Sequence, residues 1–113
     1  MNIIAIAKDN NTLAETTAAL GEVCAADSVE AFTDPMRAVQ YGMNNRIDMA
    51  FITTGFKPLD GVGLAKMLLD RYPEVRLVFI VDDSQWEYVR RLPNSRHLRT
   101  PVTRDAVKSI IRH

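Results

Sequence analysis

The sequence is poor in the residues that build disulfide frameworks and metal clusters. Among its 113 residues there is one cysteine, Cys24, and there are two histidines. A single cysteine excludes an internal disulfide framework and cannot form a zinc site by itself, so a reduced, cytoplasmic setting is expected. No apolar run approaches the ~20 residues of a membrane span, and the first residues lack the basic segment of a signal peptide. We therefore expect a soluble domain with one core and no membrane partner.

Several catalytic motifs are missing as well. No glycine-rich phosphate loop follows the first predicted strand, so a nucleotide-binding fingerprint is absent. Both histidines, His97 and His113, come late in the chain, and no Ser/His/Asp constellation is visible. Cys24 falls at the far end of the first predicted helix, which argues against an enzyme with a phosphocysteine just after its first strand. The sequence predicts no enzymatic activity, cofactor or metal.

Net charge is zero, but the charges are unevenly spread. Residues 1–88 carry seven basic and thirteen acidic side chains, whereas residues 89–113 carry seven basic side chains and one acid, Asp105. This asymmetry is typical either of a solvated basic face or of a contact with an acidic partner or with the acidic part of a second copy. Direct nucleic-acid binding by this domain alone is not expected, because the basic segment lacks helix-turn-helix spacing.

Apolar strands and amphipathic helices alternate along the chain. Strands are predicted at residues 2–7, 29–32, 48–53, 75–81 and 97–99, with a helix after each. This (βα)₅ pattern predicts an α/β fold, a parallel five-stranded sheet of flavodoxin-like order 2-1-3-4-5 with helices on both faces.

Local signals refine the first two helices. Asn10 and Asn11 supply an N-cap for the first helix. Asp34-Pro35 begins the second, because a capping residue followed by proline suits a helix start. An apolar stripe of Met36, Val39 and Met43 predicts the inward face of that helix.

The strand at residues 48–53 ends in polar residues, Thr53 and Thr54. Ligands of open α/β sheets bind at the carboxyl ends of such strands. A small-ligand crevice there would use five side chains: Asp9, Thr53, Thr54, Lys57 and Asp82. Two other interpretations of the threonines stay open, as kinase targets or as groups that satisfy the local backbone.

Several short motifs, in this order and spacing, resemble the receiver domain of two-component response regulators. They are Asp9 after the first strand, the loop Lys57-Pro58-Leu59-Asp60-Gly61, the helix Leu64-Ala65-Lys66-Met67-Leu68-Leu69, the turn Tyr72-Pro73-Glu74-Val75, and Thr100-Pro101. The resemblance covers residues 2–113 and implies a single receiver-like domain over residues 1–113. The short last helix suggests excision from a longer chain with a C-terminal output domain. The resemblance also implies a cis Thr100–Pro101 peptide bond.

The phosphorylation pocket implied by the resemblance is degenerate. Active receivers use two acidic residues after the first strand, a nucleophilic aspartate ending the third, a Ser/Thr ending the fourth, and a lysine before the proline. By resemblance these positions are Lys8, Asp9, Thr53, Val81 and Thr100. Only Asp9 is a residue of the type that active receivers have at its position. Mg²⁺ needs several oxygen ligands, and an acyl phosphate needs a carboxylate nucleophile. Aspartyl phosphorylation is therefore not expected, although phosphorylation by an unusual route stays an alternative. Lys8 either pairs with Asp9 or points to solvent.

In the family, the face built from the fourth helix, fifth strand and fifth helix commonly meets partners or a second copy. Here this face coincides with the basic segment. We define the basic face by its residues: Trp86, Arg90, Arg91, Arg96, His97, Arg99, Arg104 and Lys108. The resemblance thus predicts a pseudo-receiver of bacterial signalling that acts by phosphorylation-independent contact with an acidic protein, or as a homodimer. Small-ligand binding is the alternative.

His97 is expected to be an exposed edge-strand residue, with a pH switch as its alternative. Trp86 is expected at a contact surface or partly in the core.

Overall fold

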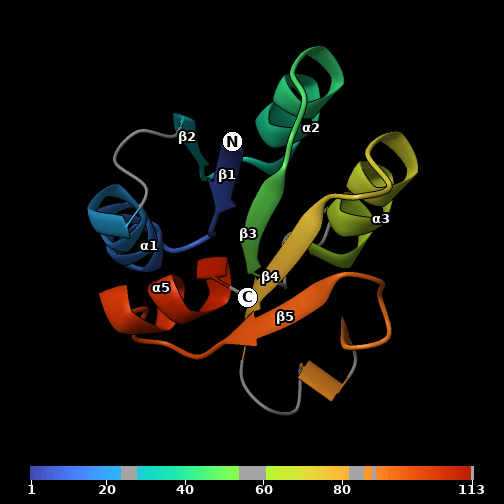
Figure 1. The fold of residues 1–113 in the computed structure, drawn as a ribbon. Coiled ribbons are helices and arrows are strands. Elements are labelled where there is room, and N and C mark those ends of the chain that lie inside the picture. Colours follow the sequence, from blue (N-terminus) through green and yellow to red (C-terminus); the bar gives the residue numbers. More distant parts are fainter. Residues whose placement is uncertain (24–27, 54–60, 82–85, 88, 113) are drawn as a thin grey trace.

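The sheet has the order that the sequence predicts. The structure is a computed structural model that describes residues 1–23, 28–53, 61–81, 86–87 and 89–112. Five strands, all parallel, are arranged as β2-β1-β3-β4-β5 (Figure 1). Their bounds are β1 (Asn2–Ile6), β2 (Ser28–Phe32), β3 (Met49–Thr53), β4 (Arg76–Ile80) and β5 (Ser95–Leu98). The fold is therefore the flavodoxin-like arrangement.

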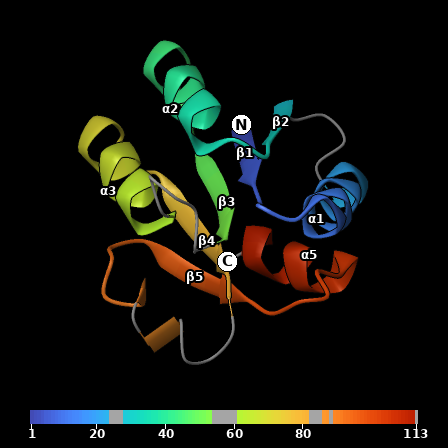
Figure 2. The ribbon, with the colours of Figure 1, turned by 180° about the vertical axis from the view of Figure 1, so that it is seen from behind.

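Helices cover both faces of the sheet, as Figures 1 and 2 show. Their bounds are α1 (Asn10–Val23), α2 (Pro35–Asn44), α3 (Gly61–Arg71) and α5 (Arg104–Arg112). α1 and α5 lie on one face, and α2 and α3 lie on the other. Residues 86, 87 and 89 are helical. No helix in the described part of the chain is long and apolar enough to cross a membrane.

The three inner strands bury the side chains of both their faces. Side chains from Met49 to Ile52 in β3 have no exposed surface, and those of β1 from Ile3 to Ile6 are at most 1% exposed. A parallel strand that is covered on both faces has no polar side to alternate with, which is why these segments are continuous apolar runs. Polar groups of β3 can therefore appear only at its ends.

The second helix packs through its small residues, which corrects the prediction for Met36 and Met43. Their side chains are 50% and 53% exposed, whereas Ala38 and Gly42 are buried. A Cβ atom on Gly42 would lie 3.2 Å from the Leu68 Cδ2 atom, so a small residue lets α2 approach α3 closely. The predicted start of this helix is confirmed, because the Asp34 side chain accepts a hydrogen bond from the Met36 amide at 2.9 Å.

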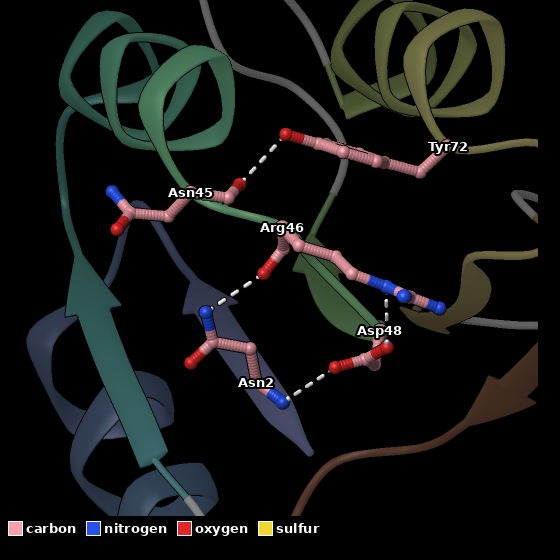
Figure 3. Close-up of polar contacts among 5 residues, drawn as sticks. All are labelled: Asn2, Asn45, Arg46, Asp48 and Tyr72. Carbon is pink, nitrogen blue, oxygen red and sulfur yellow. Dashed lines mark hydrogen bonds and ion pairs between the residues drawn. The ribbon is translucent and has the colours of Figure 1, made fainter.

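A polar cluster ties the strands together at the amino-terminal end of the sheet (Figure 3). Asp48 accepts a hydrogen bond from the Asn2 backbone amide at 2.8 Å. It also forms an ion pair with Arg46, whose Nε atom lies 3.3 Å away. The Asn2 side chain donates to the Arg46 carbonyl oxygen. The Tyr72 hydroxyl, at the end of α3, lies 2.8 Å from the Asn45 carbonyl oxygen. These contacts satisfy backbone groups where α2 ends and β3 begins.

The turn before α5 matches the prediction of a cis bond. The Thr100–Pro101 peptide bond is cis. Thr103 caps α5, because its hydroxyl accepts a hydrogen bond from the Ala106 amide at 3.2 Å. Val107 and Ile110 of this helix are buried.

Gly61 has no space for a side chain. A Cβ atom there would collide with the Thr53 carbonyl oxygen and lie 2.8 Å from the Ile52 Cγ2 atom. We expect Gly61→Ala to lower the free energy of unfolding by about 1–3 kcal/mol, because α3 must shift away from β3. Urea unfolding measures this. In Gly21→Ala, the control inside α1, the new methyl meets nothing within 4 Å, and we expect stabilisation by about 0.5–1 kcal/mol. Equal effects of the two substitutions would contradict the close packing of α3 on β3.

Candidate functional site

Asp9, the one acid among the five positions assigned by resemblance, caps a helix. Its Oδ1 atom accepts a hydrogen bond from the Asn11 amide at 3.1 Å, and its Oδ2 atom accepts from the Thr12 amide and hydroxyl at 3.3 and 3.0 Å. The prediction that Asn10 and Asn11 cap α1 is therefore wrong, since the helix starts one residue earlier. The hydrogen bond from the Asn11 amide, followed by that from the Thr12 hydroxyl, lowers the pKa of the Asp9 carboxyl. Asp9 is ionised at neutral pH, and its carboxylate oxygens accept hydrogen bonds from the first turn of α1.

Thr53 also satisfies a neighbouring backbone group. It ends β3, is half-buried, and its hydroxyl donates to the Ile6 carbonyl oxygen at 3.4 Å. This contact favours the interpretation in which the threonine serves the local backbone. It links the carboxyl ends of β1 and β3, where the active receiver pocket would hold its metal and nucleophile.

The other three positions assigned by resemblance are Lys8, Val81 and Thr100. Lys8 is exposed, and within the described residues no ion pair joins it to Asp9, which favours the solvent alternative. Val81 is 4% exposed and belongs to the core shared with α2 and α3. Thr100 is exposed. Asp9 and Thr53 both lie at the carboxyl end of the sheet. Each forms hydrogen bonds with neighbouring groups of the chain.

The small-ligand crevice is only partly covered by the structure. Asp9 and Thr53 are described above, whereas Thr54, Lys57 and Asp82 lie outside the described residues. Across the described ranges, no three or more His, Cys, Asp or Glu side chains are grouped so that they could hold a metal ion.

The basic face is exposed along most of its length. The side chains of Arg90, Arg91, Arg96, Arg99, Arg104 and Lys108 are all exposed. Arg90 and Arg104 meet described carboxylates at the surface. Arg90 lies 3.3 Å from Glu87, and Arg104 lies 3.6 Å from Asp105 and 4.0 Å from Glu22. Such exposed pairs contribute little to stability and leave the charges available to a partner.

Trp86 and His97 stack on each other within this face. Their ring centroids are 4.9 Å apart and their planes differ by 9°. His97 is half-buried, which corrects the expectation of an exposed histidine. The reason is that Trp86, itself packed against the core, covers the side of β5 from which His97 projects. The stack holds Trp86 against the edge strand β5.

One functional candidate, Arg76, was not predicted from the sequence. It is half-buried at the start of β4 and donates to the carbonyl oxygens of Ile110 and Ile111 at 2.6 and 3.3 Å. The sequence signal was a single arginine at the start of an otherwise apolar strand. A guanidinium at a helix carboxyl end also balances the helix dipole, so Arg76 holds α5 against the sheet.

Comparison with known structures identifies this fold. No family model matches the sequence, and no curated protein sequence matches it. A response regulator receiver protein from Sinorhizobium medicae WSM419 has a TM-score of 0.83 and 20% identity over 99% of this chain and 91% of that one. A two-component transcriptional regulator from Clostridium phytofermentans ISDg has a TM-score of 0.82 and 18% identity over 99% and 89%. The signal receiver domain of a DNA-binding response regulator from Colwellia psychrerythraea 34H reaches a TM-score of 0.85 at 12% identity, over 99% and 95%.

The chain has the fold of a response-regulator receiver domain. At these identities the comparison establishes the fold alone. In this receiver fold, Thr53 ends β3 and the exposed Lys8 precedes Asp9. The basic face spans residues 86–91, the edge strand β5 with the turn after it, and α5.

The helix cap at Asp9 predicts an acid-dependent loss of stability. Because the pKa of Asp9 is lowered in the folded state, its carboxylate stabilises the fold at pH values above the unfolded-state pKa of about 3.9. This stabilisation is lost as the pH falls through the lowered folded value. Asp9→Ala should therefore lower the midpoint of thermal unfolding at pH 7, and the difference from the wild type should shrink toward the acid end of a pH series.

Lys8→Ala is the control for the helix cap, because Lys8 is the exposed neighbour of Asp9. We expect it to leave the unfolding midpoint unchanged at every pH. If Lys8→Ala lowers the midpoint as much as Asp9→Ala does, Asp9 acts through an ion pair with Lys8 and not as a cap.

Proposed function

We propose that this chain is a receiver-type signalling module that works without aspartyl phosphorylation, as a binding module and not as an enzyme. Its basic face contacts an acidic surface, either on a protein partner or on a second copy of the chain. Contact of this kind needs no phosphoryl group, so the module is competent to bind in its unmodified state.

The observation that carries this proposal is the state of Asp9 and Thr53. A receiver phosphorylates a carboxylate at the end of β3, and the residue there is Thr53, whose hydroxyl donates to the Ile6 carbonyl oxygen. A hydroxyl cannot form the acyl phosphate that a carboxylate forms. Asp9, the one remaining acid of the pocket, accepts three hydrogen bonds at the start of α1. A single carboxylate committed in this way is a poor ligand for Mg²⁺.

The charge of the basic face supports contact with an acidic partner. Residues 89–113 carry seven basic side chains against one acid, while the rest of the chain is acidic. Exposed charges at the rim of an interface mainly raise the association rate and exclude partners of the same sign. The face therefore favours acidic proteins, and the acidic surface of a second copy meets the same requirement.

A double charge reversal tests the basic face. We expect Arg90→Glu with Arg91→Glu to weaken binding of a glutamate decamer, or self-association where the chain dimerises, by roughly tenfold or more at low salt. The loss should shrink as NaCl screens the charges. Isothermal titration calorimetry with the decamer and sedimentation equilibrium of the chain alone provide the two measurements.

The matched control is Arg37→Glu with Lys66→Glu. These exposed residues lie on α2 and α3, away from the basic face, and the change in net charge is the same. We expect a much smaller loss from this pair. Equal losses would mean that net charge alone attracts the decamer, and a wild-type chain that neither binds the decamer nor associates would contradict the proposal.

A further inference from the structure

Strand β2 lies at one edge of the sheet, and in the described part of the chain no strand lies beyond it (Figures 1 and 2). The Ala7 amide donates to the Phe32 carbonyl oxygen at 3.2 Å, so the backbone groups of Phe32 point toward β1. Along a strand that pairs on one side, the direction of these groups alternates from residue to residue. The N–H and C=O groups of Val29 and Ala31 therefore point outward, away from β1.

The side chains of β2 divide between the two faces of the sheet. Phe32 projects toward α2, because its ring centroid lies 5.5 Å from that of Tyr41. Glu30, two residues earlier in the strand, projects to the same face and is exposed. Val29 projects to the other face and packs against the core beneath α1 and α5. The free edge therefore carries a carboxylate on the side of α2.

A cavity of about 410 Å³ opens beside this edge, and its lining residues are Ala31, Phe32, Thr33, Asp34 and Arg37. Arg37 is exposed and stands one helical turn before Tyr41, on the flank of α2 that faces β2. Asp34 caps α2 through the Met36 amide. Among the described residues, neither Glu30 nor Arg37 forms an ion pair. An exposed carboxylate and an exposed guanidinium thus lie near one edge without joining each other.

A second copy of β2 can extend the sheet at this edge. In an antiparallel pair with a two-fold axis at Ala31, that residue pairs with its counterpart and Val29 pairs with Thr33 of the other copy. The outward N–H and C=O groups of the two strands then exchange hydrogen bonds. A two-fold contact of this kind uses the same surface on both copies and closes after two.

The charges favour the axis at Ala31. This register places Glu30 opposite Phe32 of the second copy, beside the cavity that Arg37 lines, and symmetry repeats the contact. An axis at Glu30 would place one Glu30 opposite the other, which is unfavourable for a cross-strand pair. An axis at Val29 would move Glu30 away from the second copy's cavity.

We propose that β2 pairs with β2 of a second copy, so that two five-stranded sheets join across a two-fold axis. The contact uses the outward backbone groups of Val29 and Ala31 and two symmetric ion pairs between Glu30 and Arg37. β5 lies at the opposite edge of the sheet, so the pairing leaves both basic faces accessible. One consequence rests on the proposed function: the dimer offers two basic faces to an acidic partner, and bivalent contact raises the affinity.

Sedimentation equilibrium and amide hydrogen exchange of the whole chain test the pairing. We expect a reversible monomer–dimer equilibrium, with slower exchange of the Val29 and Ala31 amides as the protein concentration rises. Ala31→Pro removes an amide that points away from β1, so the fold should persist while dimerisation weakens more than about tenfold. The ¹H–¹⁵N NMR spectrum of the variant checks that it keeps its fold.

A charge exchange tests the register. Glu30→Arg should weaken dimerisation roughly tenfold, because symmetry brings like charges together in both pairs. Arg37→Glu should weaken it similarly. An equimolar mixture of the two variants should restore the dimer, since the mixed dimer has opposite charges at both contacts, and failure to restore it would overturn the proposal. The control Glu74→Arg makes the same change in charge in the exposed turn before β4 and should alter dimerisation less than about twofold.

Two further outcomes would overturn the proposal. One is association that Arg90→Glu with Arg91→Glu abolishes and Glu30→Arg leaves unchanged, which would place the contact on the basic face. The other is a chain that stays monomeric at about 1 mM, which would leave the edge of β2 to an extended segment of another protein. Because Arg37 belongs to this contact, the control pair Arg37→Glu with Lys66→Glu reports on the basic face through the decamer titration alone.

Discussion

Strands β1, β3 and β4 bury the side chains of both their faces, and this double burial decides where chemistry can occur in the molecule. From Met49 to Ile52, β3 has no exposed side-chain surface. Functional groups are therefore confined to the ends of the strands and to the uncovered edge strands. Of the described residues at the carboxyl end of the sheet, Asp9 caps α1 and Thr53 donates a hydrogen bond to β1. At the edge of the sheet, β2 directs the backbone groups of Val29 and Ala31 away from β1.

The strand order followed from the sequence because alternating apolar runs and amphipathic helices leave few ways to build a parallel sheet. The predicted inward face of α2 is confirmed at Val39 but wrong at Met36 and Met43, for a physical reason. Hydrophobic periodicity marks large residues, yet α2 packs through Ala38 and Gly42, and the methionines that form the visible stripe are exposed. The start of α1 was misplaced because Asp9, Asn10 and Asn11 are all good capping residues, and only the geometry shows which one accepts the hydrogen bonds.

The candidate sites differ in how far a sequence can reveal them. The five pocket positions were assigned by resemblance and stay a prediction, and the basic face was predicted because most of its residues are close in sequence. The edge position of β2 followed from the predicted strand order, but the direction of its backbone groups did not, since that depends on the register with β1. The stacking of Trp86 on His97 was missed because it joins the edge strand to a segment eleven positions earlier in the sequence. Contacts between elements that are distant along the chain depend on the tertiary fold and leave no periodic signal.

The central claim is that the receiver fold is used here without receiver phosphorylation. The most direct measurement is a ¹H–¹⁵N NMR titration of the chain with Mg²⁺ and then with beryllofluoride, which mimics a phosphoryl group. With Asp9 committed to α1 and threonine at position 53, no saturable shifts should appear at Asp9, Thr53 or Thr100. Saturable shifts at those residues would mean that a cation and phosphoryl site persists at the carboxyl end of the sheet, and would contradict phosphorylation-independent action.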